Sequence, residues 1–158
     1  MAGRENPFER QLAIAEHGFS ALIWVKRGDA TSTVLFDTGV SNNGLLHNLD
    51  ALEINKADLR AISLSHGHAT HAMGLPGLVD RLGPRSMPLV LHPDAYLDRK
   101  IVLPNGFELQ IPAPKKADFQ REHIEVIGET GPSMLVDDEI LVSGGVARRT
   151  EFVFRAED

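Results

Sequence analysis

The chain contains no cysteine, and this absence removes disulfide bonds, thiolate metal ligands and a cysteine nucleophile from its chemistry. Histidine, carboxylate and hydroxyl groups remain for a reactive site. Long hydrophobic runs are missing too, because no stretch approaches the roughly 20 apolar residues of a membrane-spanning helix. The first residues hold no apolar core of signal-peptide length. We therefore expect a cytoplasmic protein without a membrane partner.

A surplus of basic residues is also absent. The 16 Lys and Arg residues are outnumbered by 22 Asp and Glu residues, which gives a net charge of −6 at pH 7. The basic residues are scattered along the sequence and do not gather into one stripe. Because nucleic-acid binding depends on clustered positive charge, we expect no nucleic-acid partner.

The residues that are present suit one globular domain. A chain of 158 residues is long enough to bury a core, and its 42% hydrophobic and 24% charged residues are ordinary for a soluble protein. The sequence has no internal repeat, low-complexity tract or linker. We therefore expect residues 1–158 to form a single domain.

The N-terminal part of the chain has the pattern of short strands. Residues 11–26 break at Gly18 into two apolar stretches, and residues 31–39 add a third after a turn. Their β-branched and aromatic residues favour an antiparallel β meander. Leucines then recur at helical spacing from Leu45 to Leu52, which predicts a helix.

The middle of the chain predicts a strand, a helix and a second strand, which make a βαβ unit. The strands are apolar runs at 59–65 and 87–93, and residues 71–82 place apolar side chains on one helical face. Further short strands are expected at 101–104, 107–112, 123–128, 133–136 and 139–145. This order suggests an α/β layered sandwich and not a doubly wound sheet.

Three histidines stand within six positions where the first of these strands meets the helix. Strand alternation points His66 and His68 the same way, and His71 at the head of the helix can turn toward them. Gly67 lets the backbone bend between the first two. Neutral imidazole is the commonest protein metal ligand, so the cluster predicts Zn²⁺ or another divalent transition metal, one per chain at most. The alternative is three histidines that happen to fall in an exposed loop.

Residues 66–71 (HGHATH) resemble the His-x-His-x-Asp-His signature of the metallo-β-lactamase superfamily, which also ends a strand. Residues 36–39 (FDTG) are similar to the strand-end Asp-Thr-Gly of that family. Within the superfamily, residues 15–20 (AEHGFS), 143–145 (SGG) and 150–152 (TEF) look most like the dihydropterin ribofuranosylaminobenzene phosphate synthase-like branch. The resemblance covers most of the chain.

This resemblance implies a metallo-β-lactamase-like αββα sandwich, of which the chain holds the N-terminal half or a truncated form. It implies that His66, His68 and His71 are metal ligands and that Asp37 is a buried carboxylate that supports the metal loop. It also implies a small-molecule substrate. Thr70 stands where the family has an aspartate that binds a second metal and handles the proton of the attacking water, so the catalytic residue is unknown.

The second half of the family fold normally supplies further metal ligands, and this sequence has no counterpart to them. Later histidines are His92 and His123, neither in the expected context. His92 is expected to be an ordinary surface histidine, and the alternative is that it lines a cleft. Because half of a sandwich leaves strand edges and an apolar face uncovered, we expect a homodimer or a second chain that completes the fold.

Two functions agree with these residues. The first is a metal-dependent hydrolase-like protein, in which a histidine-bound metal activates water against an ester, phosphoester or related bond. Its activity is expected to be weak, because Thr70 replaces the aspartate and the second-half ligands are absent. The alternative is a catalytically impaired or non-catalytic half-domain that binds a metal or oligomerises.

Overall fold

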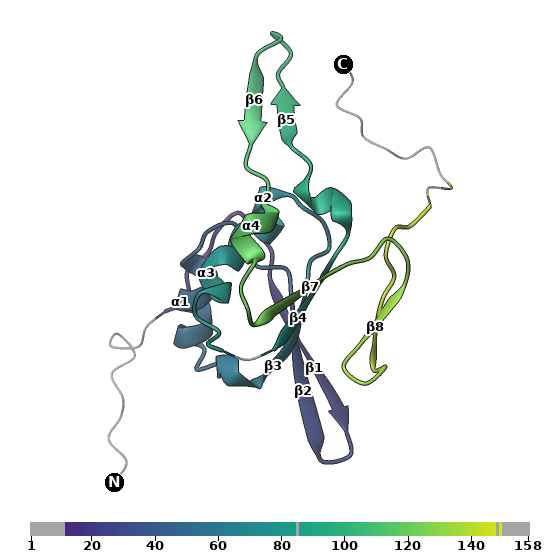
Figure 1. Cartoon of the computed structure of the whole chain (residues 1–158). Helices are drawn as coiled ribbons and strands as arrows, with labels where there is room; N and C mark the ends of the chain where they lie inside the picture. Colours follow the sequence, from purple (N-terminus) through teal and green to yellow (C-terminus); the bar gives the residue numbers. More distant parts are fainter. Residues whose placement is uncertain (1–11, 85, 148, 150–158) are drawn as a thin grey trace.

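A five-stranded sheet is the centre of the computed structural model, which describes residues 12–84, 86–147 and 149. Its strands are β1 (Ala21–Arg27), β2 (Ala30–Phe36), β3 (Leu59–Ser63), β4 (Met87–Leu91) and β7 (Ile124–Gly128), in the spatial order β1-β2-β3-β4-β7 (Figure 1). β1 and β2 pair antiparallel, and the other neighbouring strands pair parallel. The carboxyl ends of β2, β3, β4 and β7 therefore meet at one edge of the sheet.

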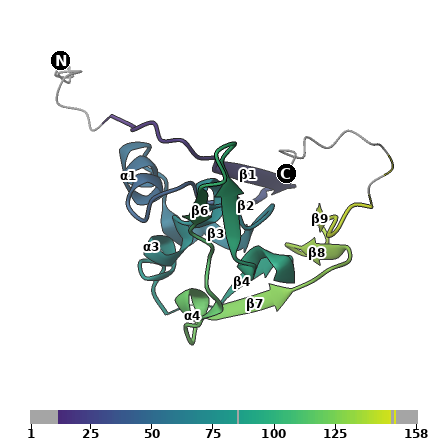
Figure 2. The same cartoon turned by 90° about the horizontal axis from the view of Figure 1, so that it is seen from above.

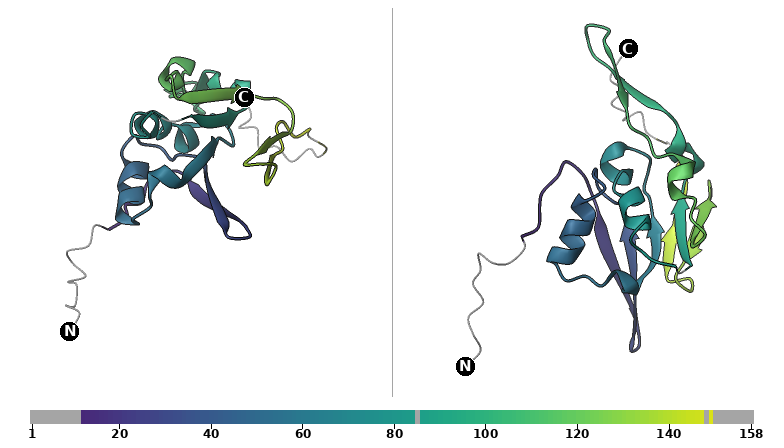
Figure 3. Two further views of the ribbon diagram at one scale, coloured as in Figure 1. Left: turned by 60° about the horizontal axis from the view of Figure 1, so that its bottom comes forward. Right: turned by 60° about the vertical axis from the view of Figure 1, so that its left-hand side comes forward.

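Helices cover one face of this sheet. α1 (Gly44–Ala51), α3 (Leu75–Val79) and α4 (Lys116–Phe119) lie together on that side, as Figures 2 and 3 show. Shorter elements are α2 (Ala69–Ala72) and the 3-10 turns η1 (Lys56–Asp58) and η2 (Pro93–Tyr96). The larger apolar core lies between helices and sheet and includes Leu35, Ile62, Leu89, Leu49, Leu78 and Phe119. Each such side chain contributes about 1.5–3 kcal/mol when fully buried.

A small hairpin covers part of the opposite face. It consists of β8 (Ser133–Leu135) and β9 (Ile140–Val142), which pair antiparallel. Leu135 of this hairpin packs with Val34, Ala61 and Val90 of the sheet in a second, smaller apolar cluster. The sheet thus has helices on one side and a two-stranded hairpin on the other, in agreement with the predicted α/β layers (Figure 2).

A second hairpin projects from the body of the domain (Figures 1 and 3). Its strands are β5 (Arg99–Val102) and β6 (Glu108–Ile111). One of its faces is apolar, because Ile101 pairs with Leu109 and the amide of Leu103 donates to the carbonyl of Phe107. These four side chains are between 42% and 59% exposed. An ion pair between Lys100 and Glu108 lies on the other face.

The predicted βαβ unit is confirmed, with one change in its helix. The predicted helix at 71–82 is two short helices, α2 and α3, which meet at Gly74. The amide of Gly74 donates to the carbonyl of Gly39. A side chain there would put its Cβ 2.0 Å from the carbonyl oxygen of Thr38, so the break brings the helices against the β2 end. The predicted helix after Asn43 is confirmed as α1.

The N-terminal meander was predicted with three strands and has two, β1 and β2. The backbone N–H and C=O of Ile14 bond to the side chain of Asn48 in α1, so this part of the first predicted strand lies against the helix and not in the sheet. The five later strands are confirmed within a few residues as β5 to β9. α4 was not predicted, because four residues with one buried side chain, Phe119, carry no helical periodicity.

Among the residues that the structure describes, no helix has the length and apolar character needed to cross a membrane.

Candidate metal centre

The three histidines meet just beyond the carboxyl end of β3. His66 lies in the loop after the strand, His68 is the N-cap of α2, and His71 lies in the first turn of that helix. The ring centroid of His66 is 4.4 Å from that of His68 and 4.3 Å from that of His71. The fold therefore brings together the three side chains that were singled out from sequence.

Asp37 lies beneath this cluster and is fully buried. Its Oδ1 accepts the backbone N–H of Ser65 at 2.8 Å. Its Oδ2 lies 2.7 Å from Oγ of Ser65 and 2.8 Å from Nδ1 of His71. Since a buried carboxylate is stable only when its oxygens are hydrogen-bonded, these contacts explain how the charge of Asp37 is tolerated.

Proton accounting along this network fixes the free nitrogen of two histidines. Nδ1 of His71 donates to the carboxylate of Asp37, which leaves Nε2 of His71 without a proton in the neutral ring. The Ser65 hydroxyl donates its single proton to Asp37, so it accepts from Nδ1 of His66 at 2.8 Å. Nε2 of His66 is then also unprotonated. One carboxylate thus orients two imidazoles and leaves the Nε2 of each able to accept a proton or a hydrogen bond.

Asp37 holds this position in a left-handed backbone conformation, with φ at 58°. Aspartate adopts this region more readily than most residues, although it still costs free energy. The surrounding chain fixes it: the amide of Asp37 donates to Ser63, and its carbonyl accepts from the Ser20 hydroxyl. Next to it, both the amide and the hydroxyl of Thr38 donate to the carbonyl of His71. The carboxylate is therefore held from β2, β3 and α2 together.

Arg99, at the start of β5, contacts the histidine loop, the backbone between His66 and His68. Its guanidinium donates to the carbonyl oxygen of Gly67 at 3.1 Å. It also donates to the carbonyls of Asp94, Ala95 and Leu97, the turn that leads into the projecting hairpin. A Cβ on Gly67 would lie 2.0 Å from the carbonyl oxygen of Ala95, so the loop and the turn are in close backbone contact.

The fit of the cluster to a metal ion depends on ring spacing. Within residues 12–84, 86–147 and 149, no three His, Cys, Asp or Glu side chains are arranged as a bound ion requires. Rings that share one tetrahedral ion, with nitrogens about 2.0–2.1 Å from it, have centroids roughly 5 Å apart, which is more than the distance of the His66 ring from that of His68 or His71. The donor chemistry fits a zinc-type ion, and the rings must separate by roughly 1 Å to admit it.

Burial and neighbouring charges favour the neutral form of the His66 imidazole. Burial lowers the pKa of His66 below its ordinary value of 6.5, and the neighbouring His71 and His68 lower it further. Asp37 acts in the opposite direction. The neutral imidazole, which is the form that binds a metal, is therefore favoured at neutral pH.

Thr70 lies in α2 between His68 and His71, half-buried. Its hydroxyl is no substitute for a carboxylate as a metal ligand or base. Sequence reasoning found His66, His68, His71 and Asp37 but missed Ser65 and Arg99. Ser65 directly precedes the first histidine, which is a usable signal. Arg99 contacts the loop from 32 residues away, which only the fold shows.

Comparison with known proteins identifies the family of the chain. The model of the metallo-beta-lactamase superfamily matches residues 15–144. The 7,8-dihydropterin-6-methyl-4-(beta-D-ribofuranosyl)-aminobenzene-5'-phosphate synthase of Methanocaldococcus jannaschii is 34% identical over 95 residues, which are 60% of this chain and 30% of that protein. The chain therefore spans less than a third of the length of this relative.

Three solved structures that are similar to the chain are metallo-beta-lactamases. They include a B3 enzyme with an active-site glutamic acid (TM-score 0.42, 16% identity, 75% of this chain and 46% of that chain) and the B3 enzyme MEM-A1 from a soil metagenome library (0.39, 15%, 75% and 46%). Rm3 metallo-beta-lactamase gives 0.40 and 20%, over 73% of this chain and 45% of that chain. Since the family model matches well over half of its residues, the chain belongs to the metallo-beta-lactamase superfamily.

Proposed function

We propose that this chain is a metal-dependent hydrolase-like domain in which His66, His68 and His71 hold Zn²⁺ or a similar divalent ion. Superfamily membership supports a metallohydrolase-like role. The observation that carries the proposal is the buried Asp37 carboxylate, which orders His71 directly and His66 through Ser65. A histidine cluster without a role in binding would not need a fully buried charge beneath it.

The chain's own residues bind and orient in this proposal. Asp37 and Ser65 hold Nδ1 of two imidazoles, which leaves their Nε2 atoms unprotonated, and Arg99 holds the loop between His66 and His68. A bound metal of this kind supplies a water of lowered pKa and polarises the oxygen of an ester, phosphoester or related bond. Thr70 brings no carboxylate to take up the proton, and loss of a general base costs about 10²- to 10⁴-fold in rate.

Metal content per chain, measured by elemental mass spectrometry after zinc loading and desalting, tests the proposal. About one ion per chain is expected in the wild type, with loss in His66→Gln and His71→Gln. His123→Gln is the matched control, because Nε2 of His123 contacts the carbonyl of Val79 far from the cluster. Turnover of p-nitrophenyl acetate and bis(p-nitrophenyl) phosphate should be highest in the zinc-loaded wild type and should fall in the variants that lose zinc. A wild type that retains no zinc would refute the proposal.

The competing proposal is a non-catalytic module that binds the metal without turnover. The absence of a carboxylate at Thr70 favours it, because a metal ion can be held there without a base that takes up the proton of the attacking water. One tightly held zinc together with no hydrolysis above free zinc would support this module and exclude the hydrolase.

We also propose that two copies of the chain associate through the projecting hairpin. Its apolar face, formed by Ile101, Leu103, Phe107 and Leu109, is exposed, and exposed patches of this kind mark contact surfaces. Light scattering should show a dimer for the wild type and a monomer for the double variant Leu103→Ser/Phe107→Ser. Lys100→Ser, on the charged face, is the control. A monomeric wild type would refute the association.

A further inference from the structure

A groove of about 450 Å³ lies on the sheet face opposite the helices, between the sheet and the β8–β9 hairpin. Val34, Phe36 and Val90 of the sheet form one wall, and Ile140 and Val142 of β9 form the other. Ser65, next to the first histidine, lines the same groove. The groove therefore joins an apolar trough to the histidine end of the sheet.

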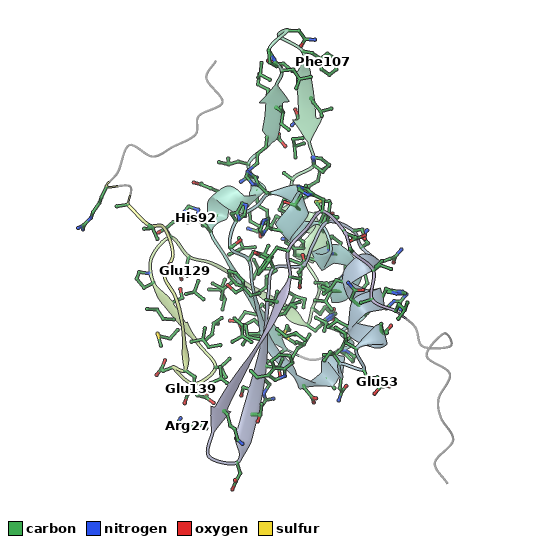
Figure 4. All side chains as sticks on the ribbon, turned by 180° about the vertical axis from the view of Figure 1, so that it is seen from behind. Arg27, Glu53, His92, Phe107, Glu129 and Glu139 are labelled. Atoms are coloured by element: carbon green, nitrogen blue, oxygen red, sulfur yellow. The ribbon has the colours of Figure 1, made fainter. Side chains whose placement is uncertain are left out.

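Three polar side chains stand side by side along this end. Ser63 pairs with Val90, and Leu91 pairs with Gly128 in the parallel ladder. Continuing that register places Ser65, His92 and Glu129 at one level, just past β3, β4 and β7. All three line the groove, and Figure 4 shows His92 and Glu129 on the side of the sheet that carries the β8–β9 hairpin. Ligands of parallel sheets bind at these carboxyl ends.

His92 presents a hydrogen-bond donor to the groove. Its Nδ1 accepts the amide of Asp94 at 3.1 Å, so the proton of the neutral ring is on Nε2. A Cβ built on Gly145, which follows the groove-lining Gly144, would lie 3.8 Å from this Nε2. The cleft-lining alternative for His92 is therefore the one that the structure supports, and the expectation of an ordinary surface histidine was wrong.

Glu129 sets the charge of the groove. Of the described residues that line it, none is Lys or Arg, and Glu129 is the only one with a carboxylate. An anionic ligand would therefore approach a like charge with no Lys or Arg among the described lining residues to compensate it, which weakens its binding. A neutral or cationic ligand with an N–H group would instead gain a charge-assisted hydrogen bond.

We propose that this groove is the ligand site of the domain and that Glu129 and His92 determine its specificity. The ligand has an apolar body, a hydrogen-bond donor for Glu129 and an acceptor such as a carbonyl for His92. It carries no phosphate or other anionic group at that end. If the proposed hydrolase activity exists, its substrates are then neutral acyl or amide-type molecules in preference to phosphoesters.

Two fluorescent probes with one skeleton test the charge of the site. N-phenyl-1-naphthylamine is neutral with a single N–H, and 8-anilinonaphthalene-1-sulfonate is its anionic analogue. Titrations use the full chain after metal removal, so the result does not depend on zinc or turnover. The wild type should bind the neutral probe more tightly by about 3- to 10-fold, the size of one like-charge interaction near a protein surface.

Variants at Glu129 locate the effect, and the side chain is exposed enough to be replaced without loss of packing. Glu129→Gln should remove the preference for the neutral probe, and Glu129→Lys should reverse it. Glu125→Gln and Glu125→Lys are matched controls, because Glu125 is exposed on β7, the strand that Glu129 follows, but does not line the groove. Equal affinities in the wild type, or a preference that ignores Glu129, would overturn the proposal.

The neutral carbonyl-containing probe Prodan tests His92. His92→Asn keeps an oxygen that accepts the Asp94 amide but replaces the Nε2–H of the ring by the amide N–H of a shorter side chain. Prodan affinity should fall by about 2- to 10-fold, the range of one neutral hydrogen bond, while N-phenyl-1-naphthylamine affinity stays unchanged. Equal losses for both probes would mean a structural effect and exclude His92 as a specificity determinant. These titrations use metal-free protein, so their outcomes do not depend on whether the chain binds zinc. The proposal for the groove and the proposal for the metal site can therefore fail independently.

Discussion

Oδ2 of Asp37 lies 2.8 Å from Nδ1 of His71 and 2.7 Å from Oγ of Ser65, so one buried oxygen orders two histidines. This contact joins the end of β2 to the loop after β3 and to α2. It places a charge under the cluster where water cannot reach it. The stability of the domain and the proposed binding of a metal therefore depend on the same carboxylate.

Replacing Asp37 should reduce both properties together. Asp37→Asn tolerates the left-handed φ but replaces an acceptor with a donor, and each charge-assisted hydrogen bond lost costs about 1.5–3 kcal/mol. Urea denaturation should show a lower free energy of unfolding, and zinc retention should fall. Asp37→Ala should be worse, because alanine also resists the backbone conformation. A stable Asp37→Asn variant with full zinc content would contradict this role.

The histidine cluster and its strand–helix setting could be predicted from sequence because they are local. His66, His68 and His71 lie within six positions, and the strand before them is a short apolar run. The division of the helix at Gly74 could not be predicted, since it depends on the carbonyls of Thr38 and Gly39 on another element. The contact of Arg99 could not be predicted for the same reason, because the carbonyl that it contacts, on Gly67, lies 32 residues away in the sequence.

The positions of the groove residues Glu129 and His92 could be predicted from sequence in part. Glu129 follows directly after the apolar run at 123–128 and His92 follows β4, so counting one position past each parallel strand would have found both. What sequence could not supply is which predicted strands are neighbours. β7 pairs with β4 although a hairpin and a helix separate them in the chain.

Arg99 should position the histidine loop without contributing much to global stability. Lysine keeps the charge in Arg99→Lys but cannot reach the four carbonyls that the guanidinium contacts. Zinc affinity should fall by about 10-fold, the lower end for residues that support metal ligands indirectly. Arg60→Lys, on an exposed position of β3, is the control and should leave zinc affinity unchanged. Equal affinities for both variants would show that Arg99 does not position the loop.

Gly67→Ala should disturb the same loop sterically. The added Cβ would meet the carbonyl oxygen of Ala95 at 2.0 Å, and relief of such a clash costs about 1–3 kcal/mol. Thermal unfolding and zinc content should both decline. Gly131→Ala is the matched control, because no atom lies within 4 Å of its Cβ position and its φ is not positive. If the two variants behaved alike, the close packing of Gly67 would have no energetic consequence.

Thr70→Asp should raise hydrolysis if the proposed activity exists. The new carboxylate would lie in α2 between His68 and His71, where it can accept a proton from water. General-base catalysis contributes about 10²- to 10⁴-fold, so a gain of roughly 10²-fold in turnover of p-nitrophenyl acetate is expected. Thr70→Asn, which has the same shape without a base, is the control. Equal rates for Thr70→Asp and Thr70→Asn would show that a carboxylate at position 70 does not act as a general base in this chain.

Tyr96 offers a prediction that does not depend on any metal. Its hydroxyl is buried with no hydrogen-bond partner among the described residues, and its ring packs on Phe119 with centroids 6.1 Å apart. Burial raises the pKa of Tyr96 above its ordinary value of 10.0. It is the single tyrosine of the chain, so the absorbance of tyrosinate reports this group alone. The midpoint should lie above 10 in the folded protein and return to about 10 in denaturant.

The sign of the linked stability change follows from that shift. Because the pKa of Tyr96 is raised by folding, its contribution is complete below pH 10 and is lost as pH rises through the folded value. Tyr96→Phe removes a buried group without a partner among the described residues and keeps the ring contact with Phe119, so it should unfold at the same or higher urea concentration. It should also lose less stability above pH 10 than the wild type. A destabilised Tyr96→Phe variant would mean that the hydroxyl makes a hydrogen bond that stabilises the fold.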